Sequence, residues 1–302
     1  MSDSIMHIRS VSEGHQLLGL ESPKHPLITI LDESQLRIPK EMVGVRLMTD
    51  LYYIALKGSN CGMQYGRNQY DFDGGVLVFT APGQVVAPTE EIEENSGSGW
   101  MLFFHPDLVR SSSLGENIDR YSFFNYEVYE ALHLSDSEEQ ILTDCASMIR
   151  NEYKQRIDNH SQNVIVSTLE LMLNYCLRFY ERQFNTRTNH HKDVVTQFEN
   201  NLKAYFNSDL LLDQGAPTIQ YFADQVHLSQ NYLSDLLKKE TGRSAKDHIN
   251  DFIVEKAKSV LLNSDHSVSE IAFNLGFNYP HYFSRLFKAK TGYTPQEYRT
   301  LN

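Results

Sequence analysis

Cysteine is scarce in this sequence, and long apolar runs are missing. The 302 residues include three cysteines, Cys61, Cys145 and Cys176, which are too scattered for a disulfide framework or a paired-cysteine metal site. No apolar run approaches the roughly 20 residues that span a bilayer, and Met1–Ser10 lacks the apolar core of a signal peptide. We therefore expect a reduced, cytoplasmic protein with no membrane partner.

Positive charge is also in short supply. The formal net charge is -12, which at first argues against a nucleic-acid partner. The acidity is uneven, however, because residues 1–189 hold 15 Lys and Arg against 26 Asp and Glu, a net charge of -11. Residues 190–302 hold 12 against 13, a net charge of -1. Any attraction of the C-terminal part for DNA therefore depends on where its charges lie.

The first half has the pattern of short strands. Val43–Leu56 and Val76–Thr80 mix β-branched, aromatic and aliphatic residues between clusters of Gly, Asn, Pro and Asp. Trp100–Phe104 is a continuous apolar run, which predicts a strand buried on both faces. This spacing favours a small β-barrel or sandwich over about residues 1–134.

Helical periodicity replaces the strand pattern after about residue 134. Ser135 and Glu138 have the spacing of a capping box, and a second helix is expected from about Gln162 to Phe184. The second helix carries an apolar stripe of Ile165, Leu169, Met172, Leu173 and Cys176. The stripe fits a dimer seam and the packing of two helices on the barrel equally well. The polar segment 185–192 predicts a linker between domains 1–184 and 193–302.

The C-terminal part contains an internal repeat. Tyr232–Gly242 aligns with Tyr282–Gly292 at an offset of 50 residues, with six of the eleven positions identical. The pattern around each copy is helix, tight turn, helix, over residues 218–242 and 267–292.

Caps and turns support this assignment. Thr218 is placed as the N-cap of the first unit, and Ser267 and Glu270 form a capping box in the second. Gly276 supplies a left-handed turn residue, whereas His227 occupies the same place in the first copy at some cost in backbone strain.

The second helix of each unit has an apolar face and a polar face. The polar stripes are Asn231, Ser234, Asp235 and Lys238 in one copy and His281, Ser284, Arg285 and Lys288 in the other. One such stripe is usually an ordinary solvated surface, but two at equivalent places favour DNA recognition. Ala245–Leu262 predicts a helix roughly 27 Å long between the units. It could hold the two helices about one DNA turn apart, near 34 Å.

From about Val194 to Arg299 the chain resembles the AraC/XylS family of transcription regulators. The resemblance rests on the paired units and on Lys238–Gly242, Ile271–Phe277, Tyr282–Arg285 and Thr291–Pro295. It implies that the second helix of each unit enters the major groove of double-stranded DNA. The base-facing residues would be Asn231, Ser234, Asp235, His281, Ser284 and Arg285, with Lys238 and Lys288 on phosphates. Asp235 departs from the family's frequent basic residue, and would accept from a cytosine amino group or repel phosphate.

The same resemblance implies an α+β chain whose N-terminal cupin-like barrel and two helices sense an effector and dimerise. A small-molecule effector and a homodimer are therefore expected, and RNA polymerase is a partner that the resemblance allows. Candidates for an effector pocket are Tyr52, Tyr53, Tyr65, Arg67 and Trp100. Aromatic residues on short strands belong to a core more often than to a pocket.

An enzyme that carries the same DNA-binding module is the alternative. A DNA-repair methyl acceptor needs activated cysteine thiolates, and Cys61 has no paired thiol or zinc cluster near it. A metal-dependent cupin enzyme needs closely spaced histidines, whereas His15, His25 and His105 are isolated. No Gly-rich phosphate loop or nucleophile elbow is present. The sequence therefore predicts a protein that is not an enzyme and needs no metal or cofactor.

Overall fold

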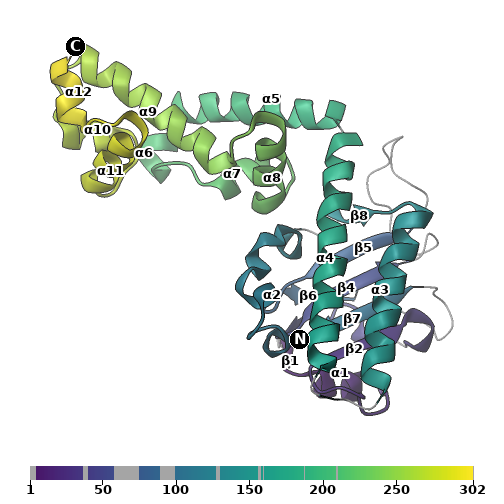
Figure 1. The fold of residues 1–302 in the computed structure, drawn as a ribbon. Helices are drawn as coiled ribbons and strands as arrows, with labels where there is room; N and C mark the ends of the chain where they lie inside the picture. Colours follow the sequence, from purple (N-terminus) through teal and green to yellow (C-terminus); the bar gives the residue numbers. More distant parts are fainter. Residues whose placement is uncertain are drawn as a thin grey trace. The chain divides into compact units, whose positions relative to one another are not determined.

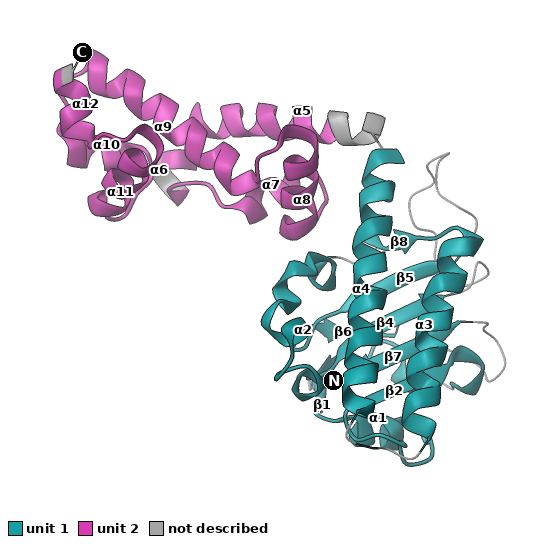
Figure 2. Ribbon diagram, viewed as in Figure 1, with its two compact units in different colours: residues 1–186 teal, residues 187–302 magenta. Residues whose placement is uncertain are grey.

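The chain forms two compact units, residues 1–186 and 187–302 (Figure 2). The computed structural model describes residues 5–36, 40–57, 75–88, 99–126, 130–155, 158, 160–186, 188–208 and 210–301. Strands lie in the first unit and the second is helical, so the predicted α+β class is confirmed (Figure 1). Within the described ranges, no helix is long and apolar enough to cross a membrane.

The described strands of the first unit form two sheets. The larger has the order β2-β7-β4-β5-β8 with antiparallel pairing throughout. Its strands are β2 (Ile28–Asp32), β4 (Tyr52–Lys57), β5 (Val76–Thr80), β7 (Trp100–Phe104) and β8 (Leu132–His133). The smaller, β1-β3-β6, consists of β1 (Met6–Ile8), β3 (Leu47–Thr49) and β6 (Val85–Val86), with β1 and β3 parallel.

Two of the three predicted strands are confirmed with their boundaries. The third, Val43–Leu56, is divided into β3 and β4 by a turn at Asp50–Leu51. The larger sheet is covered on one face by α3 (Asp136–Lys154) and α4 (Ser161–Thr186) (Figure 1). Its other face carries an apolar cluster that includes Leu31, Ala55 and Met101. Burial on both faces explains why β7 is a continuous apolar run.

Short helical segments connect these elements. They are α1 (Val11–Leu17), α2 (Ser113–Glu116) and 3-10 turns at Glu33–Gln35, Lys40–Met42, Pro106–Leu108, Ile118–Arg120 and Ser122–Asn125. The predicted capping box at the start of α3 is confirmed, because Ser135 accepts from the Glu138 amide and Glu138 accepts from the Ser135 amide.

The apolar stripe of α4 is buried within residues 1–186. Ile165, Leu169, Met172, Leu173 and Cys176 are all 0% exposed. Since α4 packs closely against α3 and the sheet, these side chains are core, and the dimer-seam interpretation of this stripe is wrong. The sequence alone could not decide, because helical periodicity shows that a face is buried but not by which neighbour.

The predicted linker is largely helical. Residues 185 and 186 end α4, and residues 188–192 begin α5 (Thr188–Phe206). The segment is polar but contains neither Pro nor Gly, so nothing in its backbone chemistry stops a helix. Polarity alone was therefore a poor indicator of irregular structure here.

Eight helices, α5 to α12, are described in the second unit. After α5 come α6 (Leu210–Gln214), α7 (Ile219–Gln225), α8 (Gln230–Thr241), α9 (Ala245–Asn263), α10 (Val268–Asn274), α11 (Pro280–Thr291) and α12 (Pro295–Leu301). The helix pairs α7–α8 and α10–α11 are the two predicted units, and α9 joins them. The predicted long helix between the repeats is confirmed within one residue of its end.

Candidate nucleic-acid interface

Each helix-turn-helix unit is built by local hydrogen bonds that the sequence encodes. The Thr218 hydroxyl accepts from the Tyr221 amide at the start of α7, at 3.2 Å. Ser267 and Glu270 form the expected capping box at the start of α10. Gly242 and Gly292 end α8 and α11 in the left-handed conformation, with φ of 76° and 82°. The boundaries of both units therefore follow from capping chemistry.

The turns between the paired helices have the same backbone conformation but a different residue at the equivalent position. His227 has φ 54° and Gly276 has φ 82°, so both lie in the left-handed region. The predicted departure of the first copy is confirmed, and it places an L side chain where glycine is favoured. Ala223 and Ala272, both 0% exposed, lie between the crossing helices.

The apolar faces of α8 and α11 form the core of the second unit. Leu233, Leu236 and Leu237 are at most 1% exposed, and Phe283 and Phe287 are 0% exposed. This packing turns the opposite face of each helix outward, which is where the predicted DNA contacts lie.

The predicted contact residues are more exposed on α11 than on α8. His281, Arg285 and Lys288 are exposed on α11, and Lys238 is exposed on α8. Asn231, Ser234 and Asp235 on α8 are half-buried. Ser284 is also half-buried, and its hydroxyl donates to the Pro280 carbonyl at 3.2 Å. The second unit therefore presents more of its predicted face to solvent.

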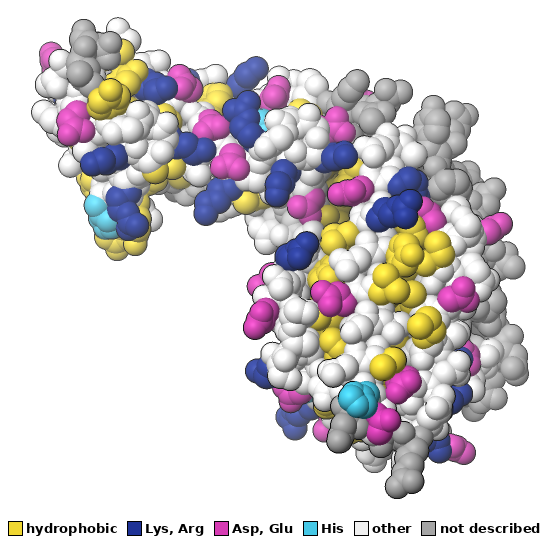
Figure 3. Space-filling view, in the orientation of Figure 1, with side chains coloured by type: hydrophobic (Ala, Val, Ile, Leu, Met, Phe, Trp, Pro, Cys, Tyr) yellow, Lys and Arg dark blue, Asp and Glu magenta, His cyan; other side chains and the backbone are white. Residues whose placement is uncertain are grey.

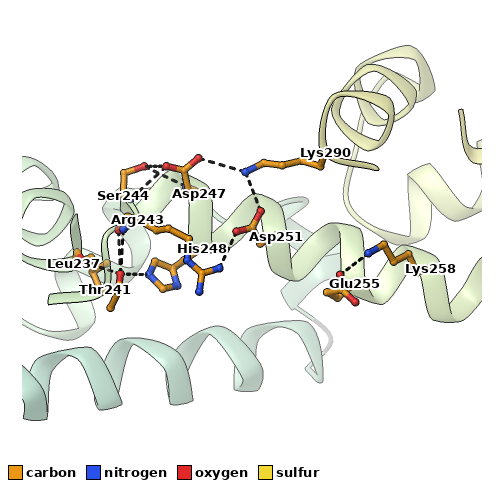
Figure 4. Close-up of polar contacts among 10 residues, drawn as sticks. All are labelled: Leu237, Thr241, Arg243, Ser244, Asp247, His248, Asp251, Glu255, Lys258 and Lys290. Carbon is orange, nitrogen blue, oxygen red and sulfur yellow. Dashed lines mark hydrogen bonds and ion pairs between the residues drawn. The ribbon is translucent and has the colours of Figure 1, made fainter. Parts of the chain in front are cut away.

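Two sets of basic residues in residues 187–302 differ in their partners. Arg243, Lys258 and Lys290 form ion pairs with carboxylates of α9 (Figure 4). In the part of the chain that the structure describes, no ion pair is found for Lys238, Arg285 or Lys288. The charges of these three side chains are therefore available to a phosphate or a base.

The connecting helix sets the scale of the interface. Helix α9 has 19 residues, which corresponds to about 28 Å at about 1.5 Å per residue. It contacts α8 of the first helix-turn-helix unit, α10 and α11 of the second, and α12. One turn of DNA is about 34 to 36 Å long, so the length of α9 suits two helices that enter successive major grooves.

The C-terminal region matches a known family, described as a helix-turn-helix domain, over residues 222–300. A related protein is the uncharacterized HTH-type transcriptional regulator in the cgkA 5'region of Pseudoalteromonas carrageenovora. It is 34% identical over 108 residues, which cover 36% of this chain and 57% of that protein. The HTH-type transcriptional activator RhaS of Salmonella arizonae is 38% identical over 77 residues, covering 26% of this chain and 28% of RhaS. The match thus spans less than two thirds of either relative.

A solved structure is also similar to this region. The C-terminal domain of the two-component response regulator yesN from Fusobacterium nucleatum is 29% identical, with a TM-score of 0.32. The similarity covers 35% of this chain and 98% of that domain. The family match and the named relatives agree with the resemblance found in the sequence. Residues 222–300 form an AraC-type helix-turn-helix domain.

Helix α5 supports the AraC-type domain from outside the matched range. Phe198 of α5 is 0% exposed and packs edge-on against Phe222 of α7, with ring centroids 5.3 Å apart. It also contacts the ring of His248 on α9 at 5.7 Å. These contacts close the core of the first helix-turn-helix unit. Helix α5 is therefore part of the fold of residues 187–302.

An aromatic cluster at the start of α11 was missed by the sequence analysis. Tyr279 is 60% exposed and Tyr282 is 55% exposed. The ring of His281 lies 4.2 Å from that of Tyr282 and 5.8 Å from that of Tyr279. Figure 3 shows a histidine and basic side chains over α11 beside hydrophobic ones. Exposed rings beside the predicted base-facing residues are suited to contact with thymine methyl groups.

The internal repeat hid this cluster. Tyr282 aligns with Tyr232, but Tyr232 is only 3% exposed. Identity between the copies suggested one shared role, whereas the two side chains have opposite environments. The sequence signal that could have revealed the difference is the aromatic and imidazole density of Tyr279–Tyr282, which Ser229–Tyr232 lacks.

The described effector candidates of residues 1–186 lie on both faces of the larger sheet. Along β4, Tyr52 and Tyr53 point to opposite faces of the sheet. Tyr52 stacks on Phe104, with ring centroids 4.8 Å apart, and the Trp100 ring nitrogen donates to Thr143 of α3 at 3.1 Å. The Tyr53 hydroxyl instead donates to the Met101 sulfur at 3.2 Å. Tyr65 and Arg67 lie outside the described residues.

The isolated histidines of the first unit have structural hydrogen bonds. His15 bonds the Glu21 carbonyl at 2.6 Å and the Thr29 hydroxyl at 2.9 Å. His25 accepts from the Leu27 amide, and His105 accepts from the Asp107 amide. Among the residues that the structure describes, no group of three or more His, Cys, Asp or Glu side chains could hold a metal ion.

The two described cysteines are unlike activated thiols. Burial raises the pKa of Cys145 and of Cys176. A methyl acceptor requires the opposite shift, since the thiolate is the nucleophile. Cys61 lies outside the described residues. The described cysteines therefore give no support to the methyl-acceptor alternative.

Proposed function

We propose that the chain is a sequence-specific transcription regulator that binds double-stranded DNA through α8 and α11. The observation that carries this proposal is the equivalence of the two helices. Each lies second in a duplicated helix-turn-helix unit, buries its apolar face and turns a polar face with available Lys or Arg charge outward. An α-helix fits the major groove, where every base pair presents a distinct pattern of donors and acceptors.

The proposed roles follow from the chemistry of each side chain. Arg285 can donate two hydrogen bonds to O6 and N7 of a guanine, which is the commonest specific contact of arginine. His281 and Ser284 would read neighbouring bases on α11, as Asn231, Ser234 and Asp235 would on α8. Lys238 and Lys288, in the last turns of their helices, would bind phosphates and fix the register of the helices on the duplex.

The proposal is tested by selecting duplexes with the full chain from a pool of random sequence. We expect a sequence to be enriched and to bind about a thousandfold more tightly than a scrambled duplex of the same composition. Equal affinity for the selected and scrambled duplexes at physiological salt would reject sequence-specific binding.

For the first unit we propose a cupin-like effector-binding domain in a cytoplasmic regulator. The support is the face of the larger sheet that carries Tyr53, where the mostly apolar cluster adjoins the buried Glu33. Burial and the Glu33 charge raise the pKa of Tyr53, so its hydroxyl stays a hydrogen-bond donor at neutral pH. Small molecules that raise the melting temperature of the full chain but not of Tyr53→Ala would support this location. A ligand that stabilises both equally binds elsewhere.

We also propose a homodimer, formed by a different surface from the buried stripe. Three large apolar side chains are exposed on the two covering helices: Met148 (55%) on α3, and Val164 (43%) and Leu171 (46%) on α4. Figure 3 shows hydrophobic side chains over these helices. Light scattering of the full chain should give twice the mass of one chain. The Leu171→Asp variant should give a mass closer to that of a single chain. Contacts with RNA polymerase would then place this dimer at a promoter.

A further inference from the structure

A single carboxylate joins the ends of the two recognition helices. Asp251 lies on α9, and its Oδ1 pairs with Lys290 Nζ at 2.8 Å while its Oδ2 accepts from Arg243 Nη1 at 3.2 Å (Figure 4). Lys290 belongs to the last turn of α11, and Arg243 follows the Gly242 cap of α8. Both oxygens of one side chain are therefore used, one by each helix-turn-helix unit.

A second carboxylate on α9 strengthens the same junction. Asp247 lies 3.4 Å from Lys290 Nζ, and it accepts from the Ser244 hydroxyl at 2.7 Å as part of the α9 capping box. The hydrogen bond from Ser244 lowers the pKa of Asp247, and the hydrogen bond to Asp251 raises the pKa of Lys290. These groups therefore remain charged near neutral pH, which keeps the junction intact.

The junction is made at positions where the two copies of the repeat differ. Lys290 aligns with Glu240, and Arg243 aligns with Tyr293. Two identical copies of either unit would lack one of the two cations at this point. Lys290 is also withdrawn from the basic group that is available to DNA, because its partners are carboxylates of its own chain. The charge reversal at residue 290 thus serves a contact within the domain.

A backbone contact holds the two units at a second point. The Ala216 amide, just before α7, donates to the Gly276 carbonyl in the turn of the second unit at 3.0 Å. A Cβ on residue 276 would lie 2.2 Å from the Ala216 nitrogen, so only glycine permits this approach. The Asp251 junction and this backbone contact therefore both restrain the angle between the units.

We propose that Asp251 is a positioning residue that sets the spacing of the two DNA elements the domain accepts. This inference rests on the proposed function. Adding one base pair between the elements moves the second by about 3.4 Å and rotates it by about 35° around the helix axis. Because the Asp251 junction is one of the contacts that restrain the two units, its loss should let them follow that movement at a lower cost in binding free energy.

The test compares affinities of the full chain for duplexes that differ only in spacing. The duplexes are the selected sequence and versions with one base pair inserted or deleted between its two elements. We expect the wild-type chain to lose about tenfold or more in affinity on either change, and Asp251→Asn to lose about threefold or less. The ratio cancels the general gain in DNA attraction that follows from removing a negative charge.

The control is Glu255→Gln, which makes the same change of charge on the same helix. It breaks the Lys258–Glu255 ion pair, 2.7 Å long, which lies within α9 and joins no other element. Glu255→Gln should keep the wild-type spacing ratio. Exposed ion pairs contribute little to folding, so both variants should remain folded by circular dichroism.

Several outcomes would overturn the inference. A folded Asp251→Asn chain with the full spacing penalty would do so, as would a wild-type chain that binds all spacings equally. If Asp251→Asn does not fold, Lys290→Gln removes the same contact from the exposed end of α11 and decides by the same ratio. A wild-type chain that enriches no sequence would instead reject the proposed function.

Discussion

At the scale of single residues, two exposed cations of α11 differ in the DNA groups that they suit. Arg285 and Lys288 are both exposed and lie one turn apart on the same helix. Arginine presents a rigid fork that matches a guanine edge, whereas lysine is a mobile point charge that suits phosphate. Neighbouring residues of the same charge are thus expected to have different effects on binding.

Arg285→Ala should weaken binding to the selected duplex by about 1 to 3 kcal/mol and relax the preference for one base pair. Lys288→Ala is the matched control, because it should weaken selected and scrambled duplexes alike and lower the salt slope by about one unit. Titrations of both variants against both duplexes provide the measurement. Equal losses of Arg285→Ala on the two duplexes would remove Arg285 from the base-reading set.

Residue-level predictions from the sequence succeeded where the cause is local. The sequence placed Lys238, His281, Arg285 and Lys288 on exposed faces, because helical periodicity and the apolar stripe decide orientation together. The sequence did not reveal the exposure of Tyr282. The equivalent Tyr232 is buried by tertiary contacts within the first helix-turn-helix unit, which the sequence pattern does not show. The pocket candidates Tyr52 and Tyr53 failed to converge because neighbouring strand residues face opposite ways.

At the scale of elements, the turn between the paired helices distinguishes the two units. His227 is exposed and adopts the left-handed conformation, which costs a residue with a Cβ about 1 to 2 kcal/mol. Gly276 has the same conformation and also a close backbone neighbour. The turn of the first helix-turn-helix unit therefore carries backbone strain that the glycine in the second avoids.

His227→Gly should raise the local stability of the first helix-turn-helix unit by about 0.5 to 1 kcal/mol. The backbone strain that is relieved costs more free energy than the conformational entropy that glycine loses on folding. Hydrogen exchange of the α7 and α8 amides in the full chain, followed by mass spectrometry, should become slower. The reverse change, Gly276→Ala, should speed exchange in α10 and α11, because its Cβ meets the Ala216 nitrogen. Faster exchange in His227→Gly would show that the imidazole makes a stabilising contact.

Element boundaries were predictable where capping residues mark them. The starts of α3, α7 and α10 follow from Ser135, Thr218 and Ser267, whose side chains accept from amides within the same turn. The helical structure of the described residues of segment 185–192 could not be foreseen, because polar residues without Pro or Gly are compatible with an irregular linker as well as with a helix. The partner of the α4 stripe could not be read from periodicity, since α3 and a second chain would bury it equally well.

At the scale of the whole molecule, charge and core are both divided between the two units. Residues 1–189 carry a net charge of -11 and residues 190–302 a net charge of -1. The second unit has its own repeat, caps and buried aromatic core, including Phe198, Phe222, Phe283 and Phe287. From this division we expect residues 187–302 to fold without residues 1–186.

A fragment of residues 187–302 should fold by circular dichroism and bind the selected duplex. It should also bind scrambled duplexes more tightly than the full chain, because the acidic unit no longer repels phosphate. Gel shifts of fragment and full chain at low and physiological salt give the comparison, and the difference should shrink as salt rises. A folded fragment that binds no DNA at low salt would mean that DNA binding depends on dimerisation through the first unit.

Methylation interference tests whether α8 and α11 enter successive major grooves on one face of the duplex. Methylation of guanine N7 blocks the major groove, and methylation of adenine N3 blocks the minor groove. For the full chain on the selected duplex, we predict interference at guanine N7 in two clusters about 10 base pairs apart. A single cluster, or interference confined to adenine N3, would show that the two helices do not both enter the major groove.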